Sequence, residues 1–215
     1  MISKAQITAD SIANSLRSEI SETASASLVV SGGSSPIEIF KHLKLQEIEW
    51  SLVKIFLVDD RVVDLNSKHS NQLLVKTHLL QKNASEAELV PLSTDQIYYN
   101  TLPTKFTVTL LGVGTDGHFA SLFPNLLLES GPSSQTHPDL ASSSQPRIIK
   151  IPAQGDPFVP RISMNLSLIL NSKRIILLAN GIEKQAILAK AEVDRTLPVH
   201  FLINQKILPI EIESL

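Results

Sequence analysis

The hydrophobic positions along the chain follow two different spacings in turn, and this alternation predicts its helices and strands. Across residues 5–20 they recur every three or four positions, which is typical of one face of an amphipathic helix. Residues 27–31 form a short apolar run that is followed by two glycines, as a buried strand is before a tight loop. A second helical pattern covers residues 37–43, and Ser35 and Glu38 predict a capping box at its start.

The same order of elements repeats along the rest of the chain. We predict strands at residues 53–60, 106–114 and 173–179, an edge strand at 147–151, helices at 70–80 and 182–191, and a short helix from about residue 120. Residues 130–146 are rich in Ser, Pro and Gln and are expected to form a surface loop. Apolar strands that alternate with helices favour an α/β fold with a doubly wound, mostly parallel sheet flanked by helices on both faces. We expect one domain over residues 1–215, with its site beyond the carboxyl ends of the strands.

Composition narrows the possible functions. With 43% hydrophobic residues and 19 Lys and Arg against 21 Asp and Glu, the chain is neither a disordered acidic tail nor a basic nucleic-acid binder. The absence of Cys excludes disulfides, a thiolate nucleophile and Cys-ligated metal sites. No apolar run reaches the roughly 18 residues of a membrane span, and the N-terminus lacks the apolar region of a secretory signal. We therefore expect a soluble cytoplasmic protein. Because its net charge is −2, it must hold any anion by local geometry.

Three polar segments follow the first three predicted strands. The first contains Ser31, Gly32, Gly33 and Ser34, whose amides would face outward at a helix N-terminus and form an anion cradle suited to phosphate. A plain strand-to-helix turn is an equal alternative, and Glu38 in the first helical turn opposes an anion there.

The second polar segment contains two acids and a guanidinium. Asp59 and Asp60 should point to opposite sides of an extended chain, and Arg61 follows them. An Arg in this place is suited to bidentate capture of phosphate or carboxylate, while a strand-end ion pair is the alternative.

The third polar segment, residues 112–124, combines three glycines with Asp116 and His118. Glycines let a ligand approach the backbone, and an acid beside an imidazole is suited to proton transfer near neutral pH, so we expect a functional His118. None of the other histidines pairs with a His three or four residues away, so no catalytic metal is expected. Arg161 and Lys184, each an ordinary surface charge when taken alone, would complete a positive pocket at this edge of the sheet.

At this point the sequence resembles a known family. The strings that carry the likeness, in order, are SGGSSP, DDRVVDLNSKHSN, GVGTDGHFASLFP, PRISMNLSLILNSKRIILLANGIEK and LPVHFL. They span nearly the whole chain and are similar to those of 6-phosphogluconolactonases of the bacterial and eukaryotic cytosolic type. The resemblance implies a Rossmann-like fold related to glucosamine-6-phosphate deaminase. It also implies hydrolysis of 6-phospho-D-glucono-1,5-lactone to 6-phosphogluconate, in the oxidative pentose phosphate pathway, without metal or organic cofactor.

The resemblance also implies roles for individual residues. It assigns His118 as the general base with Asp116 as its neighbour. It assigns the phosphate to Ser31, Gly32, Gly33, Ser34, Arg61 and Lys184, with Arg161 as a further ligand. The expected partner is a phosphosugar lactone, with no nucleic acid or membrane, and the chain is expected to be a monomer or weak homo-oligomer.

The chain departs from the family pattern in three places. The acid pair is Asp59–Asp60 where the family has Asp-Glu, the residues before Ser70–Asn71 differ, and PRISMN replaces PRITLT, so that Asn165 stands at a Thr position.

Two other functions remain open. A sugar-phosphate isomerase or deaminase on the same fold would use Asp59 or Asp60 to carry a proton, but such enzymes continue the DGH loop as AFNEP, whereas this chain reads ASLFP. A sugar-phosphate sensor in a transcription regulator would need a DNA-binding helix-turn-helix. The residues before the first predicted strand hold one helix and little basic surface.

Overall fold

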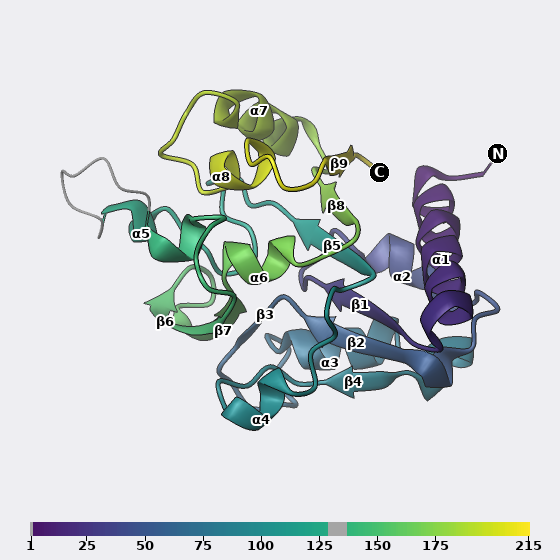
Figure 1. Cartoon of the computed structure of the whole chain (residues 1–215). Helices are drawn as coiled ribbons and strands as arrows, with labels where there is room; N and C mark the ends of the chain where they lie inside the picture. The colour runs from purple at the N-terminus through teal and green to yellow at the C-terminus, as the bar shows by residue number, and fades with distance from the viewer. Residues whose placement is uncertain (1, 129–136) are drawn as a thin grey trace.

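The computed structural model describes residues 2–128 and 137–215, and its centre is a six-stranded parallel sheet between layers of helices (Figure 1). The strands lie in the order β4-β2-β1-β5-β8-β9, and each neighbouring pair is parallel. Their bounds are β1 Ala26–Val30, β2 Val53–Leu57, β4 Glu88–Val90, β5 Val108–Gly112, β8 Ile175–Leu178 and β9 Ile210–Glu213. The predicted α/β fold class is confirmed.

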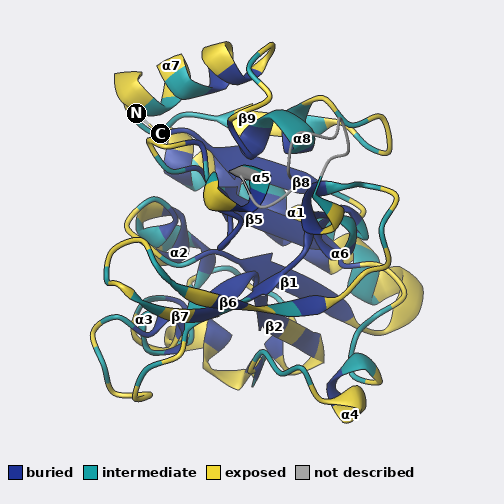
Figure 2. Cartoon of the chain, turned by 90° about the vertical axis from the view of Figure 1, so that its left-hand side faces the viewer, coloured by how far each residue is buried: buried dark blue, intermediate teal, exposed yellow. Residues whose placement is uncertain are grey.

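Helices cover both faces of this sheet because successive residues of each strand point to opposite sides. On β1, Leu28 and Val30 pack with α1 (Lys4–Thr23), α2 (Ile37–Leu43) and α3 (Asn71–His78), whereas Val29 packs into the other layer. That second layer contains α4 Gln96–Tyr99, α6 Leu166–Leu170, α7 Ile182–Ala191 and α8 Val199–Ile203. Figure 2 shows the result as a buried sheet with exposed outer helix faces.

A second sheet of three antiparallel strands, in the order β3-β7-β6, lies beside the second layer. Its strands are β3 Asp59–Arg61, β7 Val159–Met164 and β6 Ile148–Gln154. The predicted strand at residues 53–60 is therefore wrong in one respect, because it divides between two sheets. Val58 joins them: its amide bonds Val30 of the main sheet, and its carbonyl accepts from Met164 of the second. The predicted edge strand, residues 147–151, is an edge of this smaller sheet.

Local capping decides several helix boundaries. The helix predicted at residues 5–20 is α1, where the Ser3 side chain accepts from the Gln6 amide. The capping box predicted for α2 does not form, since Pro36 occupies the N-cap and Ser35 bonds to Lys184 instead.

Other boundaries differ from the prediction. The short helix predicted near residue 120 is absent from the described residues; α5 begins at Asn125 (Asn125–Leu128), and Ala120 has a φ of 51°. Part of the predicted loop, residues 130–136, lies outside the described residues, while 137–146 includes a 3-10 turn, Pro138–Leu140. The remaining 3-10 turns are Trp50–Leu52 and Lys82–Glu86. Among the described residues, no helix has the length and apolar character needed to cross a membrane.

Candidate active site

A cavity of about 230 Å³ opens where the carboxyl ends of β1 and β5 meet the second sheet. The structure brings most of the predicted site residues to its wall: Ser31, Gly32, Gly33, Ser34, Arg61, His118, Arg161 and Lys184. Asp116 does not line the cavity, but its Oδ1 contacts Nδ1 of His118, which does. Residues from five separate segments thus meet at the edge of the sheet where α/β folds place their sites.

The cradle after β1 presents unused amide donors. The amides of Gly32, Gly33 and Ser34 make no hydrogen bond within residues 2–128 and 137–215. Gly33 has a φ of 79°, a conformation that favours glycine. A Cβ on Gly32 would lie 1.8 Å from Oδ1 of Asn71, so only glycine fits there. Such amides can bind an anion.

Two guanidinium groups lie side by side at the cavity, because β3 and β7 pair Arg61 with Arg161. Nη1 of Arg61 donates to Oδ1 of Asn71 at 2.6 Å and to the His69 carbonyl at 3.1 Å, while its buried Nε has no partner among the described residues. Arg161 is 4% exposed and donates to the carbonyls of residues 154, 156 and 157. Burial and the charge of Arg61 lower the pKa of Arg161, although the nearby charge of Asp59 opposes this.

Lys184 adds a third cation. Its Nζ donates to Oγ of Ser35 at 3.1 Å, and burial lowers its pKa. In the part of the chain that the structure describes, Arg61, Arg161 and Lys184 form no ion pair with a carboxylate. Asp59 also lines the cavity, but three cations against one carboxylate leave an excess of positive charge, which a phosphate dianion would relieve.

The two acids before Arg61 are bound elsewhere, so the strand-end ion pair considered as an alternative does not form. Asp60 accepts from the amides of Arg61, Asn71 and Gln72 and so caps α3; burial raises its pKa against these hydrogen bonds. Asp59 is 6% exposed, and its Oδ2 accepts from Oγ of Ser121 at 2.5 Å. As predicted, the two carboxylates point to different sides of the strand.

His118 is held by its neighbours in the loop after β5. Its Nδ1 lies 2.5 Å from Oδ1 of Asp116, and its ring stacks on Phe123 with centroids 4.5 Å apart. A Cβ on Gly114 would lie 2.3 Å from the imidazole, so glycine is required for this packing. Burial would raise the pKa of Asp116, but the hydrogen bond and the charge of His118 outweigh it and lower the pKa. A carboxylate can only accept, so its hydrogen bond with Nδ1 places a proton on that nitrogen and leaves Nε2 as the nitrogen that accepts a proton in the tautomer needed for a base.

Sequence reasoning missed Asn71 and Ser121. Asn71 is 2% exposed and touches both the cradle and Arg61. Its position after the helix cap Ser70 gave no sign of this, because Asn is a common residue at helix starts. Ser121 lies within the DGHFASLFP segment, where no local pattern distinguishes it from its neighbours.

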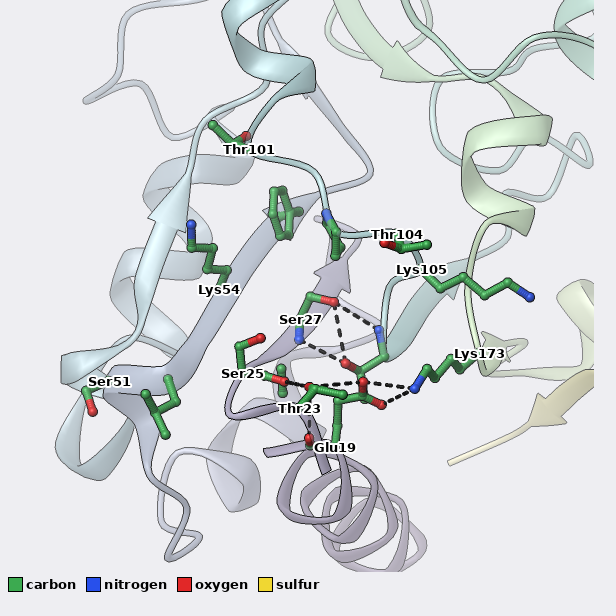
Figure 3. A pocket seen from close by; sticks show the side chains of 15 residues that line it. Glu19, Thr23, Ser25, Ser27, Ser51, Lys54, Thr101, Thr104, Lys105 and Lys173 are labelled. Atoms are coloured by element: carbon green, nitrogen blue, oxygen red, sulfur yellow. Dashed lines mark hydrogen bonds and ion pairs between the residues drawn. The ribbon is translucent and has the colours of Figure 1, made fainter. Parts of the chain in front are cut away.

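A larger hollow of about 760 Å³ lies at the opposite end of the main sheet, with Phe56 in its wall (Figure 3). Its cations are largely neutralised: Lys173 pairs with Glu19 at 2.6 Å, as Figure 3 shows, and Lys54 pairs with Glu88 at 3.6 Å. It has neither a glycine cradle nor a histidine in its wall. The smaller cavity therefore has the more specific chemistry.

Metal chemistry has little support at either hollow. Within residues 2–128 and 137–215, no cluster of three His, Asp or Glu side chains has the arrangement of a metal site.

Comparisons with known proteins agree with the geometry. A family model described as glucosamine-6-phosphate isomerases/6-phosphogluconolactonase matches residues 3–208. A 6-phosphogluconolactonase of Caulobacter vibrioides is 34% identical over 185 residues, which cover 81% of this chain and 76% of the relative. One of Rhizobium meliloti is 30% identical over 222 residues, covering 97% and 92%. The crystal structure of a 6-phosphogluconolactonase from Shewanella baltica superimposes with a TM-score of 0.81 at 30% identity, covering 98% of this chain and 92% of that one.

Proposed function

The chain belongs to the family of glucosamine-6-phosphate isomerases and 6-phosphogluconolactonases, and we propose that it hydrolyses 6-phospho-D-glucono-1,5-lactone to 6-phospho-D-gluconate. This is the second step of the oxidative pentose phosphate pathway. One observation carries the proposal: a histidine oriented by an aspartate lies in the wall of the same cavity as three cations, none of which forms an ion pair among the described residues. We also infer a cytoplasmic location, because the substrate is a charged intermediate of central metabolism.

The phosphate of the lactone binds to the positive side of the cavity. Arg61 and Lys184 supply the charge, and Arg161 on the neighbouring strand is a further cationic ligand. The amides of Gly32, Gly33 and Ser34, which have no partner among the described residues, complete the coordination, with Ser31 at the start of the cradle. Fixing the phosphate positions C1 of the lactone relative to His118, which contributes to the rate by orientation.

His118 then acts as the general base. Its Nε2 removes a proton from a water molecule as the water oxygen attacks C1, and the carbonyl oxygen becomes a tetrahedral oxyanion. When the bond between C1 and the ring oxygen breaks, the imidazolium returns the proton to that oxygen, and the product carboxylic acid then ionises. A general base of this kind supplies about 10²–10⁴-fold in rate.

The oxyanion that forms at C1 needs hydrogen-bond donors, and the glycine loops after β1 and β5 both contain backbone amides. The amide of Gly112 donates to Oγ of Ser31, and that of Gly114 donates to the His118 carbonyl. The amides of Gly112 and Gly114 are therefore not oxyanion donors, and those of Gly32 and Gly33 are already assigned to the phosphate.

The isomerase or deaminase function is less well supported. A carboxylate that carries a proton between two carbons must be free to reach both, whereas Asp59 is bound by Ser121 and Asn71 and Asp60 caps α3. The loop after His118 also contains no glutamate before Pro124.

The test is a coupled assay in which freshly made 6-phosphogluconolactone is converted to product and detected with 6-phosphogluconate dehydrogenase, after subtraction of spontaneous hydrolysis. The wild-type protein should accelerate the reaction, and His118→Ala should lower kcat by about 10²–10⁴-fold with KM changed only a few-fold. Arg61→Ala should mainly raise KM. Absence of lactonase activity together with deamination of glucosamine 6-phosphate would overturn the proposal.

A further inference from the structure

We propose that Asn71, Asp59 and Ser121 form a positioning relay that couples the guanidinium of Arg61 to the loop carrying His118. The inference rests on the proposed lactonase function and extends it to residues that no part of that mechanism uses. The three side chains are almost fully buried, with exposed fractions of 2%, 6% and 0%. They connect β3 of the second sheet, which carries Arg61, with the loop after β5 of the main sheet, which carries His118.

The first link uses both ends of one amide side chain. Oδ1 of Asn71 accepts from Nη1 of Arg61 at 2.6 Å, and Nδ2 donates to the carbonyl of Asp59 at 2.9 Å and to its Oδ1 at 3.3 Å. Because Arg61 can only donate and Asp59 can only accept when ionised, an amide is suited to lie between them. A carboxylate or an ammonium at this position would leave one neighbour without a bond.

The second link joins the relay to the catalytic loop. Oγ of Ser121 donates to Oδ2 of Asp59 at 2.5 Å, and Ser121 is three residues beyond His118. The Ser121 amide also donates to Oγ of Ser163 on β7, which fixes the loop backbone against the second sheet. The loop therefore has its position set by the same carboxylate that anchors Asn71.

The relay also reaches the cradle, because Oδ1 of Asn71 occupies the space that a side chain on Gly32 would need. A shift of Asn71 thus moves the Arg61 contact and the cradle wall together. Hydrogen bonds buried in low dielectric are strong, and a buried polar group that loses its partner is costly. The expected consequence is that binding of phosphate at Arg61 and placement of the base at His118 depend on each other.

A double-mutant cycle tests the relay, using Ser121→Ala, Asn71→Ala and the double variant in the lactonase assay. Ser121→Ala should lower kcat about tenfold and change KM less than about twofold, because it releases the loop that carries His118. Asn71→Ala should raise KM about tenfold, because it releases Arg61. The double variant should retain at least about threefold more kcat/KM than the product of the two single effects predicts, since both remove one network. Ser121→Thr, which keeps the hydroxyl, should restore most of kcat.

The control is Thr109→Val, which removes a buried hydroxyl bonded to Ser172 and has no contact with the relay. It should lower the melting temperature without changing kcat or KM, separating positioning from general destabilisation. If Asn71→Ala does not fold, Asn71→Ser replaces it in the cycle under the same criterion. Multiplicative effects of the two substitutions, or wild-type kcat in Ser121→Ala, would overturn the relay while the lactonase function stands. An inactive wild-type protein would instead overturn the proposed function.

Discussion

At the scale of single residues, hydrogen bonds hold the three acidic side chains of the site in place. Asp116 keeps its carboxylate ionised because the hydrogen bond and charge of His118 lower its pKa against the effect of burial. Asp59 and Asp60 are bound to hydroxyl and amide donors, and neither forms an ion pair with Arg61. The acids of the site therefore position groups, and the cations remain available to a ligand.

Asp116→Asn should impair catalysis more than Asp116→Ala. The amide of Asn can donate to Nδ1 of His118, which moves the imidazole proton to Nε2 and blocks the base, whereas Ala leaves both tautomers accessible. We expect kcat to fall about 10²–10⁴-fold in the Asn variant, with little change in KM, and to fall less in the Ala variant. Steady-state kinetics of both variants check this, and an Asn variant as active as the Ala variant would refute control of the tautomer.

As pH rises, the affinity of the site for a phosphorylated ligand should begin to fall at a lower pH than it would with a lysine of ordinary pKa. Burial lowers the pKa of Lys184 from its usual 10.5, so the ammonium loses its proton, and its attraction for phosphate, as pH rises through that lowered value. Calorimetric titration with 6-phosphogluconate between about pH 7.5 and 10 measures the decline. Lys184→Arg should flatten it because a guanidinium stays protonated in this range. The same slope in both proteins would exclude Lys184 as its source.

At the scale of secondary-structure elements, local patterns were sufficient for some parts of the chain and not for others. The apolar spacing of α1 predicted its buried face, because Ala9, Ile12, Ala13 and Leu16 contact the sheet directly. β3 was not predicted as a separate strand, since its polar residues pair with β7, about a hundred positions later, and long-range pairing leaves no local pattern. Asn71 was missed for a similar reason: Gly32 is distant in sequence, Arg61 lies on another element, and both become neighbours of Asn71 only on folding.

Gly32→Ala should damage the site through Asn71 rather than through the backbone. The new Cβ would lie 1.8 Å from Oδ1 of Asn71, so that side chain must move and release Arg61. We expect a loss of about 1–3 kcal/mol in the free energy of unfolding, as for other overpacked interiors, and a raised KM. Thermal denaturation and steady-state kinetics measure the two effects.

A second substitution makes this prediction specific. Asn71→Ala combined with Gly32→Ala should recover stability, because the clash is gone, but should leave KM high. Gly33→Ala is the matched comparison: its Cβ meets no atom within 4 Å, and only the left-handed φ of 79° opposes it. Its destabilisation should not be relieved by Asn71→Ala. If Asn71→Ala restores the stability of both glycine variants equally, the contact between residue 32 and Asn71 is not the cause of the destabilisation.

At the scale of the whole molecule, a chain with a net charge of −2 places three cations and one carboxylate in the wall of one small cavity. Other basic side chains are neutralised locally, as Arg174 is by Glu211 at 2.6 Å and Lys173 by Glu19. The main sheet joins β1 near the start of the chain to β9 near its end, which supports our proposal that residues 1–215 form one domain. Repulsion between Arg61, Arg161 and Lys184 therefore lowers the free energy of unfolding of the whole unliganded protein.

Inorganic phosphate should consequently stabilise the entire protein against heat. A ligand that binds only the folded state at ten times its Kd adds about 1.4 kcal/mol, which corresponds to roughly 3–6 °C in Tm for a chain of this size. Lys184→Met should reduce this shift because it removes one of the charges that bind the anion. Arg174→Met, which lies outside the cavity lining, should keep the full shift even if its own Tm is lower. Sodium chloride at matched ionic strength separates specific binding from screening. Thermal denaturation of the three proteins in both salts decides the matter: an equal shift in Lys184→Met, or an equal effect of chloride, would show that the stabilisation does not arise from the cation cluster.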